Sequence, residues 1–413
     1  MKRLIINKSH ESKVSAKRRI RKNLILKELR DRGTLSFTEV AKITHFSLPM
    51  VSDLTKDLEK EGFVIPVIPN QLKVGRPPNS VKINPCAGYI IGIDIGHTAI
   101  NIVVVNLIQE RIYERTFPSI DIKENQLLVD KMVENVNNII KHLKIPNDSI
   151  LGIGIAIPGL VNSQKGDSYT YLNFEDETTQ KVFENRFNNS IRIENDVKAM
   201  ALGEIGFGKA KEIKNAACIN LGWGIGMSLI LNGEIYYGKS GFAGEFGHII
   251  IEEKGPLCHC GKRGCLETVA SGRAIGQIAR DTLNKGIESQ IKYSIDSIDN
   301  VDEETIVEYA RRGDQFSIEI LEKAGVYIGK TLGKLINLFN PELIILGGRG
   351  SRADEFILYP IRTAALHHSL VELGKDAKIV ISDLGDMAGC LGATTLITRE
   401  IFETSHINMG RYI

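Results

Sequence analysis

The sequence has few of the features that mark secreted or membrane-bound proteins. No stretch of its 413 residues approaches the run of about 18 uncharged apolar residues that a membrane span requires. Met1-Lys2-Arg3 is followed by a short apolar stretch and then by charged residues, unlike the sustained apolar core of a signal peptide. We therefore expect a cytoplasmic protein with no membrane partner. The length allows two or three domains, each with its own core.

An excess of charge is also missing, because the net charge is only +2. That balance is uneven along the chain. Residues 1–82 contain 18 Lys and Arg against 8 Asp and Glu, a net charge of +10, whereas the remaining 331 residues contain 34 against 42, a net charge of −8. A basic segment on an acidic body favours an N-terminal module that binds a polyanion. A solvated basic tail would have the same composition.

The basic segment has the element order of a winged helix-turn-helix. Apolar residues at helical spacing predict a helix over 15–32. Ser36 and Glu39 form a capping box, which predicts a short helix ending near residue 44. After a tight turn, Ser47 is expected to cap a third helix that reaches residue 61, and a strand follows.

In such a module the third helix enters the major groove by its N-terminal half. The exposed candidates for DNA contact are Ser47, Pro49, Met50, Ser52, Asp53 and Lys56. Lys56 is better suited to a phosphate than to a base edge. The alternative is a winged helix that serves only dimerisation.

A Gly75-Arg76-Pro77-Pro78 segment comes next. It can present Arg76 to a narrow minor groove, where the negative potential is high, or act as a stiff linker, and the two roles are compatible. We therefore predict a DNA-binding domain over 1–70 and a linker over 71–87.

From Tyr89 onward, strands and helices alternate. Apolar strands are expected over 89–96 and 99–106 and again over 150–157, with an amphipathic helix over 125–143. A second strand–turn–strand unit begins at Ala216 and echoes the first. This pattern predicts an α/β fold with a duplicated lobe.

The segment from about residue 88 to the C-terminus resembles the ROK family of sugar kinases and repressors, which has the actin/hexokinase-like (RNase H-like) two-lobed fold. The motifs that carry the resemblance are Asp94-Ile95-Gly96-His97-Thr98, Glu194-Asn195-Asp196, Gly244-Glu245-Phe246-Gly247-His248, Cys258-His259-Cys260-Gly261-Lys262-Arg263-Gly264-Cys265-Leu266-Glu267 and Pro341-Glu342-Leu343-Ile344-Ile345-Leu346-Gly347-Gly348. The N-terminal segment looks like that of the family's repressor branch. The resemblance implies a first lobe formed by 88–197 with 386–413, a second lobe over 198–385, and a homodimer or a dimer of dimers.

Three of the six cysteines fall within eight residues. Cys258, Cys260 and Cys265, with His248 ten positions upstream, supply the Cys₃His set of a closed structural zinc site. The resemblance implies the same four ligands and not His259. Unmetallated thiols are the alternative. The remaining cysteines, Cys86, Cys218 and Cys390, are expected to be inert buried thiols.

The resemblance further implies a sugar site between the lobes. Its residues would be Asn195, Asp196, Glu245, His248 and Glu267. Zinc would hold one nitrogen of His248 and leave the other ring N–H for a second partner, such as a sugar hydroxyl.

Whether the chain is also a kinase depends on its phosphate-binding turns. Asp196 is the candidate catalytic base of a kinase. However, His97, Trp223 and Met227 are expected to fill phosphate space that needs glycine or small side chains. We therefore do not expect ATP or Mg²⁺ as cofactors, and we favour a regulator that binds operator DNA and a sugar or sugar-phosphate effector. The alternatives are an active ATP-dependent sugar kinase, alone or bifunctional, and a regulator whose ligand is another protein.

Overall fold

The computed structural model describes residues 12–67, 79–122 and 124–402. The chain divides into two compact units. The first unit covers Met1–Ile155, Tyr171–Ile193 and Ala393–Ile413, and the second covers Ala156–Thr170 and Glu194–Gly392. Within the described residues, no helix is both long and apolar enough to cross a membrane.

The N-terminal part of the first unit is a winged helix-turn-helix, as predicted. Its helices are α1 (Lys13–Arg32), α2 (Phe37–Thr44) and α3 (Leu48–Lys60). Its sheet has the order β1-β3-β2, formed by β1 (Leu35–Ser36), β3 (Ser80–Ile83) and β2 (Val64–Val67). Buried Val40, Val51, Leu54 and Leu58 form the core beneath these helices.

The capping box at the start of α2 is confirmed. The Ser36 hydroxyl accepts from the backbone N–H of Glu39 at 3.3 Å, and the backbone N–H of Ser36 donates to the Glu39 carboxylate at 2.7 Å. Ser47 stands at the N-cap of α3, but within the described chain its side chain makes no capping hydrogen bond.

The wing extends further along the chain than expected. Strand β3 pairs with both β1 and β2, so Ser80–Ile83 belongs to the DNA-binding module, whereas the predicted linker began at residue 71. The segment with Arg76 connects β2 to β3 and lies outside the described residues.

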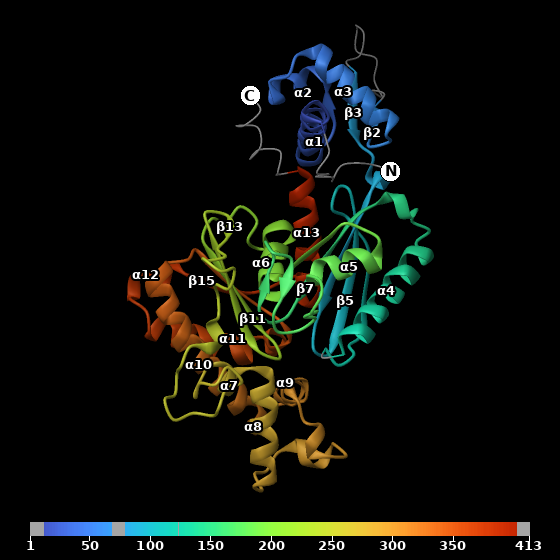
Figure 1. Cartoon of the computed structure of the whole chain (residues 1–413). Coiled ribbons are helices and arrows are strands. Elements are labelled where there is room, and N and C mark those ends of the chain that lie inside the picture. The colour runs from blue at the N-terminus through green and yellow to red at the C-terminus, as the bar shows by residue number, and fades with distance from the viewer. Residues whose placement is uncertain (1–11, 68–78, 123, 403–413) are drawn as a thin grey trace. The chain divides into compact units, whose positions relative to one another are not determined.

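The first large sheet has the strand order β10-β7-β4-β5-β6. Its strands are β4 (Tyr89–Ile95), β5 (Ala99–Asn106), β6 (Arg111–Pro118), β7 (Ile150–Ile157) and β10 (Ile191–Asn195). Strands β5 and β7 are buried along their whole length, as their apolar runs predict. Helices α4 (Asn125–His142) and α5 (Thr179–Phe187) contact each other and lie along this sheet (Figure 1).

The second unit repeats this plan. Its sheet, with the order β13-β12-β11-β14-β15, consists of β11 (Ala216–Leu221), β12 (Ile225–Leu231), β13 (Glu234–Ile235), β14 (Leu343–Gly347) and β15 (Lys378–Ile381). In both sheets, three strands that follow one another in sequence lie at one edge, and later strands add beside the first of them. The predicted duplication is therefore visible in the topology.

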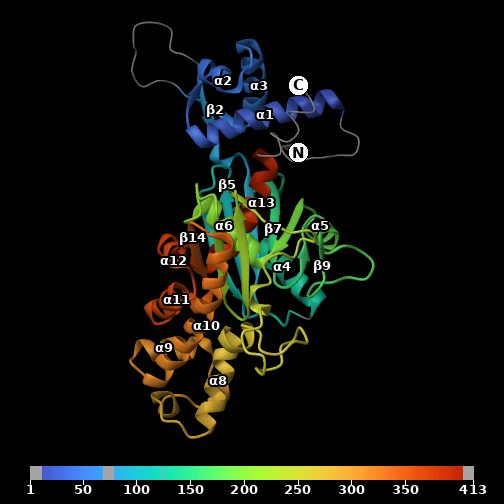
Figure 2. The ribbon, with the colours of Figure 1, turned by 90° about the vertical axis from the view of Figure 1, so that its left-hand side faces the viewer.

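Helices complete the second unit. They are α6 (Asp196–Phe207), α7 (Glu267–Ala270), α8 (Gly272–Asn284), α9 (Glu303–Arg311), α10 (Gln315–Phe339), α11 (Glu355–His367) and α12 (Val371–Asp376). Helices α8 and α9 pack on each other and on α10 (Figure 2).

Helix α13 (Ala388–Phe402) contributes residues to both units. At its start, a Cβ added to Gly392 would lie 1.6 Å from the carbonyl oxygen of Ala199, so only glycine allows this approach to α6. At its end, the Asn23 amide of α1 donates to the Ile401 carbonyl at 2.8 Å, and the Arg30 guanidinium lies 4.5 Å from the centroid of the Phe402 ring.

Candidate functional site: a histidine–cysteine cluster beside buried carboxylates

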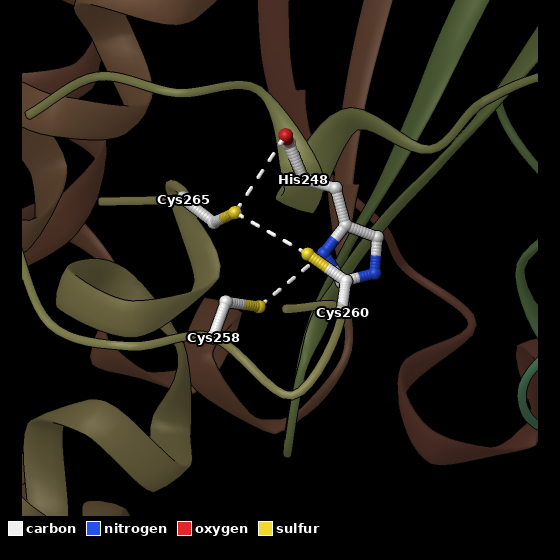
Figure 3. Close-up of side chains that lie close together, drawn as sticks. All are labelled: His248, Cys258, Cys260 and Cys265. Atoms are coloured by element: carbon white, nitrogen blue, oxygen red, sulfur yellow. Dashed lines mark hydrogen bonds between the residues drawn. The ribbon is translucent and has the colours of Figure 1, made fainter. Parts of the chain in front are cut away.

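The four predicted metal ligands come together in the second unit (Figure 3). His248 ends a short 3₁₀ turn, Cys258 and Cys260 lie on the following loop, and Cys265 immediately precedes the turn into α7. Their ligand atoms all lie within 4.8 Å of one another. The Cys258 sulfur is 3.6 Å from Nδ1 of His248, and the sulfurs of Cys260 and Cys265 are 3.7 Å apart.

The chemistry of this cluster fits a divalent cation. Burial and the neighbouring thiols raise the pKa of Cys265 to about 12, so three thiolates at this spacing need a positive charge among them. One imidazole nitrogen with three sulfurs is the donor set of a tetrahedral structural zinc. The loop needs glycine to close, because Gly264 has φ of 68° and an added Cβ would meet the Glu252 carbonyl oxygen at 1.5 Å.

Nδ1 of His248 faces the sulfurs, which leaves Nε2 on the other side of the ring. That atom lies 3.8 Å from the Glu245 carboxylate, whose side chain is half-exposed. His259, predicted not to be a ligand, directs its Nδ1 toward Glu267, at 3.1 Å from the carboxylate. It also forms a second possible ligand group with His248 and Glu267.

Asn195 and Asp196 stand at the start of α6. The Asn195 side-chain oxygen accepts from the backbone N–H groups of Val197 and Lys198, each at 3.1 Å, and so caps the helix. Its amide nitrogen donates to the Gly159 carbonyl at 3.0 Å and to the Asp196 carboxylate at 2.8 Å. Burial raises the pKa of Asp196 to about 6.

Glu267 is similarly committed to the protein. One carboxylate oxygen lies near His259 and 3.7 Å from the Arg273 guanidinium, and the other accepts from the backbone N–H of Ile225 at 3.4 Å. Asn195 and Glu267 are therefore placed to orient their neighbours, whereas Asp196, Glu245 and Nε2 of His248 have bonding capacity left for a ligand. We call the set Asn195, Asp196, Glu245, His248 and Glu267 the acidic cluster.

Two buried charges near the acidic cluster were not singled out from the sequence. Glu194 is fully buried, and its carboxylate accepts from the Tyr237 hydroxyl at 2.8 Å and from the backbone N–H of Asn195 at 2.9 Å. Lys198 is only 4% exposed. Burial lowers the pKa of Lys198, against the opposing effects of Glu194, Glu245 and Asp196. A lysine on an apolar helix has no sequence signal that separates it from a surface residue.

The phosphate-binding turns differ in part from expectation. Trp223 is half-exposed, in the turn between β11 and β12. Met227 was predicted to intrude on that turn, but it is buried in the hydrophobic core of the second unit, because its position in β12 faces inward. His97 lies in the first unit, with its ring 5.4 Å from that of Tyr171. Cys218 and Cys390 are buried as predicted, whereas Cys86 is exposed because it lies on a 3₁₀ turn.

The predicted DNA-contacting residues lie on or just before α3. Ser47, Pro49 and Lys56 are exposed, and Met50 and Ser52 are half-buried. Asp53 is instead held by α1, because the Arg18 guanidinium lies 2.9 Å from its carboxylate. Asp57 is paired in the same way with Arg18 at 2.7 Å and with Lys22 at 3.2 Å.

Those ion pairs neutralise the acidic side of α3. Because Arg18 and Lys22 lie more than 30 positions before their partners, only the fold shows that they offset charges that would repel a phosphate backbone.

Comparisons with known proteins agree with this architecture. Residues 90–400 match the model of the ROK family, and residues 18–65 match a winged helix-turn-helix DNA-binding model. The chain is 30% identical over 391 residues to the xylose repressor of Caldicellulosiruptor bescii, which covers 93% of this chain and 96% of the relative. It is 27% identical over 369 residues to the DNA-binding transcriptional dual regulator NagC of Escherichia coli, covering 89% of each.

Solved structures show the same fold. A ROK family transcriptional regulator, a homolog of the E. coli MLC protein, superposes with a TM-score of 0.78 at 24% identity and covers 94% of this chain and 98% of that one. A ROK family glucokinase from Streptomyces griseus, solved with glucose and AMPPNP, superposes with a TM-score of 0.65 at 29% identity, covering 75% of this chain and 99% of that one. The chain therefore belongs to the ROK family and joins that family's domain to a winged helix-turn-helix.

Proposed function

We propose that this protein is a transcription regulator, acting as a repressor, that binds operator DNA through its winged helix-turn-helix and is controlled by a sugar bound at the acidic cluster. The observation that carries the proposal is the joining of the two modules in one chain. Both curated relatives described above span almost the same length and are named as regulators of transcription.

The DNA-binding part of the proposal rests on α3. Ser47, Pro49, Met50, Ser52 and Lys56 are the proposed contacts, and Arg76 on the segment between β2 and β3 is a further one. A recognition helix reads base edges with its first turns, while lysines further along it contact phosphates. The net charge of +10 in residues 1–82 supports binding to a polyanion.

The sugar-binding part rests on the acidic cluster. Carboxylates accept hydrogen bonds from hydroxyl groups, and Asp196, Glu245 and Nε2 of His248 have capacity to form them. We propose that His248, Cys258, Cys260 and Cys265 bind a structural Zn²⁺. Such an ion would hold the His248 ring and the loop through Cys258 in place.

Operator binding by the intact protein tests this function. Fluorescence anisotropy would be measured with labelled promoter fragments from the protein's own operon at moderate ionic strength, with and without sugars and sugar phosphates. We expect specific binding that at least one of these ligands weakens. Failure to bind any such fragment more tightly than unrelated DNA would contradict the proposal.

A sugar kinase is the second candidate, because a buried carboxyl with a raised pKa suits a catalytic base and Asp196 has this property. Measuring ADP release across common hexoses and amino sugars separates the two functions. We expect no turnover above background. Robust turnover that is lost in Asp196→Asn would show that the chain is a kinase.

A further inference from the structure

Lys198 places a positive charge next to the acidic cluster, at a depth where charges are costly. It is the third residue of α6, directly after the Asp196 and Val197 positions, and only 4% of it is exposed. Removing an ammonium group from water is unfavourable unless hydrogen bonds and opposite charges compensate for it.

The protein supplies only part of that compensation. Among the described residues, no acceptor or carboxylate lies at hydrogen-bonding or ion-pair distance from the Lys198 ammonium, although Glu194, Glu245 and Asp196 act on it from further away. Lys209, just beyond the end of the same helix, shows the contrast. Its ammonium donates to the Ile381 carbonyl at 2.6 Å and to the Asp383 carboxylate at 2.7 Å.

The ammonium of Lys198 thus has three N–H donors among carboxylates that themselves need donors. Hydroxyl groups are the ligands that satisfy both sides, because each can accept from the lysine and donate to a carboxylate. Water can take this position in the free protein, and a polyol that displaces it would keep every hydrogen bond.

We propose that Lys198 donates a hydrogen bond to an oxygen of the bound effector and that this effector is an uncharged sugar rather than a sugar phosphate. The inference rests on the proposed sugar-binding function and names the class of ligand.

Charge decides between the two classes of ligand. Four carboxyl groups lie in or beside the site, on Glu194, Asp196, Glu245 and Glu267, and one of them is paired with Arg273. Lys198 is the cation that remains to face the other three. A phosphate monoester adds a charge of about −1.5 to −2 at neutral pH and would be repelled by this surplus of carboxylates.

The test begins with calorimetric titration of the full-length protein. The probes are glucose, xylose and N-acetylglucosamine, each compared with glucose 6-phosphate and N-acetylglucosamine 6-phosphate. We expect one free sugar to bind and the phosphorylated sugars to bind at least tenfold more weakly. Preferential binding of a phosphorylated sugar would overturn the ligand class.

Variants then test the lysine with the sugar that binds. Lys198→Met keeps the length of the side chain but removes its donors and charge, so we expect the affinity to fall roughly ten- to hundred-fold, the range for a lost hydrogen bond to a charged group. Lys198→Gln keeps a neutral donor and should recover part of the loss. Lys209→Met is the matched control, expected to leave sugar affinity unchanged.

The outcomes separate this inference from the proposed function. Equal sugar affinity in wild type and Lys198→Met would overturn the role of Lys198 while leaving sugar control intact. A wild-type protein that binds operator but none of the sugars would instead contradict sugar control itself. Zinc content and thermal unfolding are measured for each variant, and loss of cooperative unfolding in both Lys198 variants would assign the lysine a structural role and overturn the inference.

Discussion

Individual side chains at the candidate site divide into those that hold and those that have bonding capacity to spare. Asn195 caps α6 and contacts Gly159, and Glu267 is held by His259, Arg273 and a backbone N–H. Asp196 has its carboxyl buried. The residues that orient the site are thus distinct from those free to bind, although one motif match names them together.

Replacing Asp196 by Asn should make the free protein more stable and a weaker sugar binder. Burial raises the pKa of Asp196 from 3.8 to about 6, so the ionised carboxylate destabilises the folded state. The protonated form favours folding at low pH, and this contribution is lost as the pH rises through 6. At pH 7.5 we expect Asp196→Asn to unfold with about 1 kcal/mol more free energy.

Chemical denaturation at pH 7.5 and pH 5 checks this expectation, since the advantage of the variant should shrink at the lower pH. Sugar affinity, measured in parallel, should fall because an amide accepts fewer hydrogen bonds than a carboxylate. A variant less stable than wild type at both pH values would show that the carboxylate is stabilised in the fold.

Replacing Cys260 by Ser should remove the metal. Cys260 is exposed, so the substitution leaves the packed core intact while taking one of four donors from the cluster. We expect purified, chelator-washed wild type to retain about one equivalent of zinc and Cys260→Ser to retain far less, with a lower unfolding temperature. Atomic absorption measures the metal.

Cys86→Ser is the matched control, because Cys86 is also exposed but lies outside the cluster. Its zinc content should equal that of wild type. Wild-type protein containing well under one equivalent would show that the cluster holds no resident metal.

Helices α2 and α3 of the DNA-binding module begin differently, although each starts after a serine. Ser36 forms a complete capping box at α2, whereas the described structure gives Ser47 no capping bond at α3. Pro49 near the start of α3 supplies a fixed backbone angle and lacks the N–H that a cap would satisfy. The same residue type therefore has a different energetic role at the two positions.

Ser36→Ala should destabilise the DNA-binding module by about 1 kcal/mol, the usual cost of losing an N-cap. Ser47→Ala should change stability by only a few tenths of that amount, since no cap is lost. Urea unfolding followed by circular dichroism compares the two variants. An equal loss of stability in both would indicate that Ser47 caps α3 in solution.

The whole molecule separates its charges, with +10 in residues 1–82 and −8 in the remainder. This distribution predicts operator binding that weakens steeply with salt, because binding releases cations condensed on DNA. We expect affinity to fall by at least tenfold between about 50 and 200 mM salt. Lys56→Ala should reduce the slope of log affinity against log salt by about 1.

Lys375→Ala, a change on α12 of the second unit, should leave that slope unchanged. Sugar affinity should be the same in Lys56→Ala and wild type, because Lys56 belongs to the first unit and the acidic cluster to the second. A salt slope unaffected by Lys56→Ala would remove this lysine from the phosphate contacts.

Local sequence was sufficient to predict the helices and strands, the capping box and the metal ligands. Periodicity, capping and the spacing of three cysteines act between residues close in the chain, so they are visible without a fold. The family motif supplied Asn195, Asp196, Glu245 and Glu267 in the same way. The duplicated sheet followed from two similar strand–turn–strand patterns.

Contacts between distant residues had to come from the folded chain. The position of Met227 in the core, the exposure of Cys86, the pairing of Arg18 with α3 and the burial of Lys198 all depend on which elements pack together. Strand β3 joined the wing for the same reason, because its partners lie before residue 68. Burial and electrostatic pairing are properties of surfaces brought together in space, and a residue's neighbours in sequence do not specify them.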